Sequence, residues 1–126
     1  MEIVGSGSAF LLRDPNRTKF HLWFVLTDPE GVDGLMVAVM VCTMKVFADE
    51  TVVLEPGDHP FIKHQSCVAY SSAKYVKKSR IEVALRDRHC FLKESMPSPL
   101  LRRVRDGLLT SPFTIHAIRD YCAERF

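Results

Sequence analysis

The chain has 126 residues, of which 47% are hydrophobic and 25% are charged, and its formal net charge is +2. This composition argues against a disordered chain, and the length favours a single domain with a hydrophobic core. No apolar run reaches the roughly 18–20 residues that span a bilayer, and the N-terminal residues lack a signal-peptide pattern. We therefore expect one cytoplasmic domain, residues 1–126, without a membrane segment.

Charge is distributed unevenly along the chain. Residues 28–58 hold seven acids and one base, a net charge of −6, whereas residues 74–106 hold ten bases and four acids, a net charge of +6. A basic surface of this size can hold a nucleic-acid backbone through its phosphates. The alternative is a solvated basic face that balances the acidic segment, within the chain or across a dimer.

The first predicted strand spans residues 8–13, and Asp14-Pro15-Asn16 then has the composition of a turn. Two longer apolar runs, HLWFVL and LMVAVMVC, flank the connector PEGVDG. Because Val and aromatic residues favour strands and Pro, Gly and Asp favour turns, residues 20–45 predict a β-hairpin. A buried helix also fits a continuous apolar run, but the turn residues and β-branched content favour strands.

The ends of this hairpin carry polar residues. In an antiparallel pair the start of the first strand lies beside the end of the second, so we expect His21 and Thr43 to be neighbours facing a shallow groove. Lys45 shares the face of Thr43 if the strand is regular. A register shift of one residue would turn either His21 or Thr43 to the opposite face.

Further strands are predicted at residues 51–54 and 66–76, whereas residues 80–92 fit either a strand or a helix. Short strands separated by turn residues are typical of a small barrel or curled sheet. Near the end of the chain, Pro99 and Pro112 each follow a serine, which is a helix-start pattern, and amphipathic runs follow. Gly107 fits a helix stop or a tolerated defect.

The predicted fold is therefore α+β. It consists of a small antiparallel β-barrel of about five strands over residues 8–92, followed by two short C-terminal helices over residues 98–125.

Two kinds of chemistry are open for the histidines and cysteines. His59, His64 and Cys67 offer zinc ligands, although their spacing lacks the close pairs of common structural sites; histidines that hydrogen-bond locally are the alternative. Cys67 near His64, and Cys90 beside His89, also form thiol–imidazole pairs. An activated thiolate needs an exposed, electropositive environment, and the apolar context of Cys67 favours a core role. The four cysteines lack a CxxC motif, so we expect free thiols.

RNA cleavage without a metal or cofactor is the third possibility. It needs a base for the 2′-hydroxyl, a cation near the developing phosphorane charge, and an acid for the leaving 5′-oxygen. The chain supplies these residue types: His21, His59 and His64 for proton transfer, and the Thr43 hydroxyl, Lys45 and Lys63 for phosphate binding. Lys77 and Lys78, in the basic segment, are further RNA-binding candidates, as are His59 and His64.

The hairpin resembles the core of the PemK/MazF family, whose members are bacterial ribosome-independent mRNA endoribonucleases and the toxins of toxin–antitoxin pairs. Val25-Leu26-Thr27-Asp28 is similar to the end of the first family strand, and Val41-Cys42-Thr43 to the end of the second. The resemblance covers roughly residues 8–76. It implies an SH3-like barrel, a homodimer and a cognate antitoxin as partner.

The resemblance also implies site residues. Thr43 falls where the family keeps its catalytic hydroxyl, and His21 falls where it keeps its catalytic Arg. The family's Arg-Pro is absent, since His21-Leu22 stands there. A histidine carries a proton or binds phosphate, but it is not a permanent cation.

The resemblance thus implies a toxin–antitoxin-type protein that binds single-stranded mRNA and cleaves it by 2′-hydroxyl attack, with catalytic His21 and Thr43. The missing Arg-Pro favours an alternative, a non-catalytic SH3-like barrel module that binds a partner protein. A small metal- or thiol-dependent enzyme built on His59, His64 and Cys67 is the remaining alternative.

Overall fold

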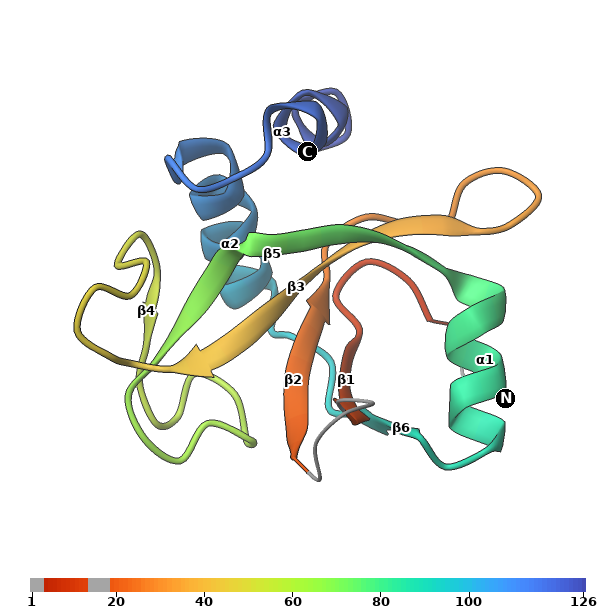
Figure 1. Ribbon diagram of the computed structural model, residues 1–126, viewed down its shortest axis with the longest axis horizontal. Helices are drawn as coiled ribbons and strands as arrows, with labels where there is room; N and C mark the ends of the chain where they lie inside the picture. The colour runs from red at the N-terminus through yellow and green to blue at the C-terminus, as the bar shows by residue number, and fades with distance from the viewer. Residues whose placement is uncertain (1–3, 14–18) are drawn as a thin grey trace.

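The computed structural model describes residues 4–13 and 19–126, and the turn predicted at Asp14-Pro15-Asn16 lies outside these residues. Figure 1 shows a curled sheet with helices on both of its faces. The elements, in chain order, are β1 (Ala9–Arg13), β2 (Phe20–Val25), β3 (Leu35–Thr43), β4 (Val53–Leu54), β5 (Ser66–Lys77), α1 (Lys78–Arg86), β6 (Cys90–Lys93), α2 (Ser98–Thr110) and α3 (His116–Ala123).

The strands form one six-stranded antiparallel sheet in the order β4-β5-β3-β2-β1-β6. The predicted hairpin is its centre, with Trp23 opposite Met40 and Val25 opposite Ala38. The sheet curls into a half-barrel, and within the described residues β4 and β6 are its two unpaired edges, so it is not closed. The predicted α+β class is confirmed, and the strands are antiparallel as expected. The closed SH3-like barrel stays a prediction.

Each face of the sheet has its own hydrophobic core. Leu22 and Phe24 of β2 belong to the core that α2 and α3 cover, whereas Trp23 and Val25 belong to the core that α1 covers. A strand buried on both faces needs apolar residues at every position rather than at alternate ones. This explains the almost continuous apolar sequence of β3. The residues of β3 that are less than fully buried are Leu35, Met40, Cys42 and Thr43.

The helices differ in part from the prediction. α2 begins at Ser98, one residue before the predicted start at Pro99, and buries Leu100, Val104 and Leu108. Ser98 does not act as the N-cap, because Pro97 holds that position and no side chain caps the helix there. α3 begins at His116 instead of near Pro112, because Pro112 and Phe113 form only a turn. The hydroxyl of Ser111 accepts a hydrogen bond from the backbone N–H of Phe113 at 3.1 Å, as a cap would, and donates one to Asp49 Oδ2 at 2.7 Å.

Residues 80–92, which fitted either a helix or a strand, contain both. They include most of α1, a turn in which Arg88 has a φ of 60°, and β6 up to Leu92. Among residues 4–13 and 19–126, no helix combines the length and the apolar character needed to cross a membrane.

Strand β5 is bent where its pairing with β3 changes register. Ala38 lies opposite Lys74, but Met40 lies opposite Ala69, so β5 has extra residues at this point. Ser72 lies within this bulge, and its hydroxyl accepts a hydrogen bond from the backbone N–H of Met40 at 2.9 Å. The bend lets β5 stay paired with β3 while the sheet curls.

Candidate functional site

A cleft with a volume of about 470 Å³ lies at the end of the central hairpin. The pairing of β2 with β3 runs from Val25 to Trp23, and the residues of both strands beyond this point line the cleft. The rest of the wall comes from Lys19 before β2, Lys45 after β3, and the loop that leads into β5. The lining residues are Lys19, Phe20, His21, Leu22, Val41, Cys42, Thr43, Lys45, Phe61, Ile62, Lys63, His64 and Ser66.

Five of the eight predicted site residues therefore line one cleft. They are His21, Thr43, Lys45, Lys63 and His64. His21 comes from β2 and Thr43 from the end of β3, as the antiparallel hairpin predicts, while the lysines and His64 come from the segments that follow β3 and precede β5.

Thr43 and His64 are in direct contact. Their Oγ1 and Nε2 atoms are 3.0 Å apart, a hydrogen-bond distance, and both side chains are exposed. Strand alternation puts His21 in phase with Trp23 and Thr43 in phase with Val41, so the two side chains start from opposite faces of the sheet. They share the cleft because it opens where the hairpin strands are no longer paired.

The charge and shape of the cleft favour an anionic, partly aromatic ligand. Three lysines, Lys19, Lys45 and Lys63, line it, and in the described part of the chain no carboxylate does. Phe20 and Phe61 add two exposed aromatic rings. The sequence analysis missed Lys19 and both phenylalanines. The available signal was closeness in the sequence, since Lys19 and Phe20 directly precede His21 and Phe61 lies just before Lys63, separated by Ile62.

His59 is outside the cleft and has a structural role. Its side chain is only 1% exposed, and its ring packs against that of Phe24. The Nε2–H group donates to the backbone carbonyl of Glu94 at 2.7 Å, and Nδ1 accepts from the backbone N–H of Phe61 at 3.1 Å. Both ring nitrogens are therefore occupied in holding the loop that carries Phe61 and Lys63.

Lys77 and Lys78 are also outside the cleft. They lie at the junction of β5 and α1, whereas the other end of β5, at Ser66, contributes to the cleft. The ammonium group of Lys77 is 3.7 Å from a carboxylate oxygen of Asp33.

The acidic and basic segments also meet elsewhere. Arg103 pairs with Asp58 at 3.3 Å, so part of the basic segment balances the acidic one within the chain.

The cysteines do not have the properties of activated nucleophiles. All four thiols are free. Cys42 lines the cleft and lies opposite Cys67 in the β3–β5 ladder, and burial raises the pKa of both thiols. An activated thiolate needs a lowered pKa, so the geometry does not favour cysteine chemistry here.

A metal centre has no support in the described residues either. There, no three His, Cys, Asp or Glu side chains gather closely enough to hold a metal ion, and the predicted set of His59, His64 and Cys67 is not such a group. His59 has both ring nitrogens engaged, as described above.

Comparison of the chain with protein-family models and with curated proteins finds no match. The resemblance to the PemK/MazF family therefore stays a prediction, and the functional argument has to come from the chemistry of the cleft.

Proposed function

We propose that the cleft binds single-stranded RNA and cleaves it without a metal ion. The observation that carries this proposal is the combination of two imidazoles, a hydroxyl and three ammonium groups in one cleft that no carboxylate of the described residues lines. Phosphodiester cleavage by a 2′-hydroxyl needs two proton-transfer groups and cations near the phosphate. His21 and His64 supply the first, and the lysines supply the second.

Binding rests on two kinds of contact. Lys19, Lys45 and Lys63 attract backbone phosphates. Phe20 and Phe61 offer rings on which unpaired bases stack, which is the usual way proteins hold single-stranded nucleic acid. A double helix keeps its bases stacked on one another, so the exposed rings favour an unpaired strand.

The cleavage step balances with the groups present. One imidazole takes the proton of the 2′-hydroxyl while the 2′-oxygen forms a bond to phosphorus. The bond from phosphorus to the 5′-oxygen breaks, and the second imidazole, in its protonated form, donates a proton to that oxygen. The products are a 2′,3′-cyclic phosphate and a 5′-hydroxyl. The lysines stabilise the negative charge that develops on the phosphorane oxygens.

Thr43 acts through its contact with His64. A hydroxyl 3.0 Å from Nε2 holds the imidazole in one orientation and exchanges a hydrogen bond with it in either protonation state. Thr43 therefore serves as a positioning residue for His64.

The test uses end-labelled, mixed-sequence single-stranded RNA with a chelator present. We expect discrete cleavage and products that end in a 2′,3′-cyclic phosphate. His21→Ala, His64→Ala and Thr43→Ala should each lower the rate at least about tenfold, equal to about 1.4 kcal/mol of barrier. Arg102→Gln, an exposed charge change on α2 outside the cleft, is the matched control and should leave the rate unchanged.

Two results would contradict the catalytic proposal. RNA binding without cleavage would favour the non-catalytic alternative, a barrel module that recognises a partner. Unfolding of the His21 and Thr43 variants, measured by thermal denaturation, would make these residues structural.

We also propose, from the resemblance in the hairpin, that the protein is a PemK/MazF-like toxin with an SH3-like arrangement, a homodimeric state and an antitoxin partner. The antiparallel half-barrel is compatible with this proposal. Light scattering tests the dimer, and growth arrest on expression of the active protein, but not of His21→Ala, tests toxicity.

A further inference from the structure

A second pocket lies on the other side of the sheet, under α1. Its volume is about 380 Å³, and it shares no lining residue with the cleft. Its floor is apolar and comes from β1, β5, α1 and β6. The aliphatic side chains of Leu12, Val76 and Ala84 are partly exposed there, above the buried Phe10 and Cys90.

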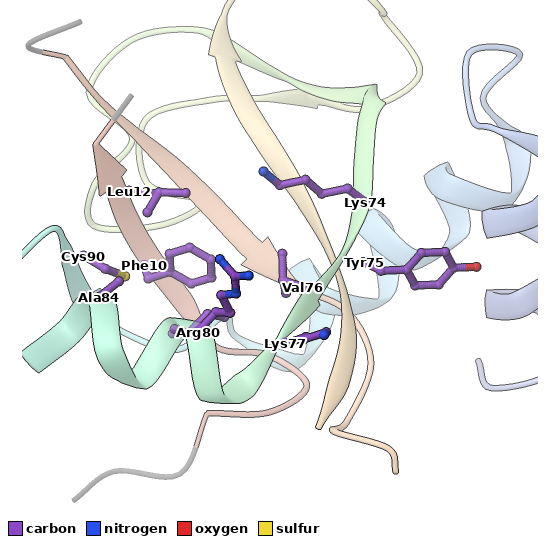
Figure 2. A pocket seen from close by; sticks show the side chains of 10 residues that line it. Phe10, Leu12, Lys74, Tyr75, Val76, Lys77, Arg80, Ala84 and Cys90 are labelled. Atoms are coloured by element: carbon purple, nitrogen blue, oxygen red, sulfur yellow. The ribbon is translucent and has the colours of Figure 1, made fainter. Parts of the chain in front are cut away.

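Two cations border this apolar floor. Figure 2 shows Arg80 reaching from α1 toward Phe10 and Val76, and Lys74 extending from β5 across the sheet. The ammonium group of Lys74 lies 4.6 Å from the centre of the Trp23 ring. Lys77 and Tyr75 also line the pocket, but the Lys77 ammonium group pairs with Asp33 and the Tyr75 ring packs on Tyr121.

The charged side chains that line this pocket are all positive. No carboxylate lines this pocket in the described residues, and Arg80 has no ion-pair partner among them. A guanidinium group is a fork of donors that matches a carboxylate or phosphate head. The lining offers no neutral hydrogen-bonding side chain that would select a nucleobase or a sugar, because the Tyr75 hydroxyl points away.

We propose that this pocket binds a single-chain amphiphile with an anionic head, a medium-chain fatty carboxylate. Its alkyl chain lies over Leu12, Val76 and Ala84, and its head meets Arg80 and Lys74. The volume falls within the range of small-molecule sites, roughly 300–1,000 Å³, and at its lower end, which fits a short chain and not a membrane surface. The site is independent of the proposed RNA function.

The test is calorimetric titration of the whole protein with a series of alkyl carboxylates. From hexanoate to octanoate to decanoate, each added methylene should tighten binding by up to about fourfold, because it buries apolar surface. Octanol, which has the chain without the charge, should bind at least about tenfold more weakly than octanoate. Emission from Trp23, the only tryptophan, gives a second readout, since Lys74 lies against its ring.

Variants separate head from tail. Arg80→Ala should weaken octanoate binding by about tenfold, and Lys74→Ala should also weaken it. In each variant the affinities for octanoate and octanol should become more alike. Arg86→Ala removes an exposed charge from the same helix outside the pocket and should leave binding unchanged. Ala84→Leu should lower affinity by filling the floor.

Three outcomes would overturn the proposal. They are equal binding of octanol and octanoate, affinity that does not change with chain length, and unchanged octanoate binding in Arg80→Ala. The first two use the unmodified protein, so they stand even if a variant fails to fold. Octyl phosphate that binds more tightly than octanoate would overturn the carboxylate assignment.

Discussion

At the scale of single residues, Gly107 shows how closely α2 approaches the sheet. A Cβ atom at this position would lie 2.1 Å from Tyr70 Oη and 2.5 Å from a Val52 methyl carbon. The Tyr70 hydroxyl lies there because it donates a hydrogen bond to the carbonyl of Val104 at 2.8 Å. The glycine is thus neither a helix stop nor a defect: it lies inside α2 and lets β5 and α2 pack together.

We predict that Gly107→Ala destabilises the protein by about 1–2 kcal/mol, because overpacking, which costs up to about 3 kcal/mol, outweighs the gain in helix propensity, about 1 kcal/mol. Urea unfolding measures this change. Arg102→Ala, at an exposed position of the same helix, should change the free energy of unfolding by less than about 0.5 kcal/mol. If Gly107→Ala is instead stabilising, the close contact with Tyr70 does not exist in solution.

The burial of two thiols leads us to predict that the folded protein loses stability at alkaline pH. Burial raises the pKa of Cys90 and of Cys122 to about 11, from an ordinary value of 9.0. The folded state therefore holds these protons more tightly than the unfolded state. Their contribution to stability is complete below about pH 9 and is lost as the pH rises toward about 11.

Urea unfolding at pH 8 and pH 10 checks this prediction. The wild-type protein should lose stability between the two values, and the loss should shrink in a Cys90→Ala/Cys122→Ala variant. Part of the loss should remain, because burial also raises the pKa of Tyr70. An equal loss in both proteins would mean that the thiols are not protected by burial.

At the scale of elements, the β5 bulge depends on Ser72. Without its hydroxyl, the backbone N–H of Met40 loses its partner at the point where the ladder is interrupted. We predict that Ser72→Ala costs about 1–2 kcal/mol of unfolding free energy. Ser71→Ala is the matched control, since Ser71 is the neighbouring, exposed serine. Equal effects of the two substitutions would contradict this role.

The hairpin and α2 could be predicted from sequence because local pattern and burial agree there. Apolar residues fill both runs of the hairpin, and α2 presents one buried stripe. α1 could not be predicted, because Ile81 is its only buried residue and Val83 is 46% exposed. Its Ile81, Val83 and Leu85 alternate as in a strand, so the choice of helix depends on the sheet beneath it.

Part of the cleft could likewise be predicted from the sequence, and part could not. The shared position of His21 and Thr43 follows from antiparallel pairing, which brings the start of one strand beside the end of the other. The side of the cleft formed by Lys63 and His64 does not follow from local pattern. It depends on the loop that His59 holds through the distant carbonyl of Glu94. A sequence does not distinguish a buried histidine that is hydrogen-bonded at both ring nitrogens, such as His59, from an exposed one, such as His64.

At the scale of the whole molecule, the proposed RNA interface is small. The three cleft lysines set the number of phosphate contacts, because part of the basic segment is already paired with acids within the chain. For a single strand, each contact adds about −0.7 to the slope of log affinity against log salt, so we predict a slope of about −2.

Filter binding of a short RNA between low and high salt measures the slope. Lys63→Ala should reduce its magnitude by about 0.7, whereas Lys78→Ala should not change it. A much steeper slope, with a contribution from Lys78, would indicate that RNA follows the basic segment and not the cleft.

The position of β1 in the sheet has a consequence for the order of assembly. β1 lies between β2 and β6, and Ala9 pairs with both Phe24 and Lys93. During synthesis its first partner emerges early, but its second emerges only after most of the chain, and closing so long a loop is slow. Until then β1 is an exposed edge that another chain can pair with. Ribosome-bound chains that end before β6 should therefore aggregate more readily than chains that include it.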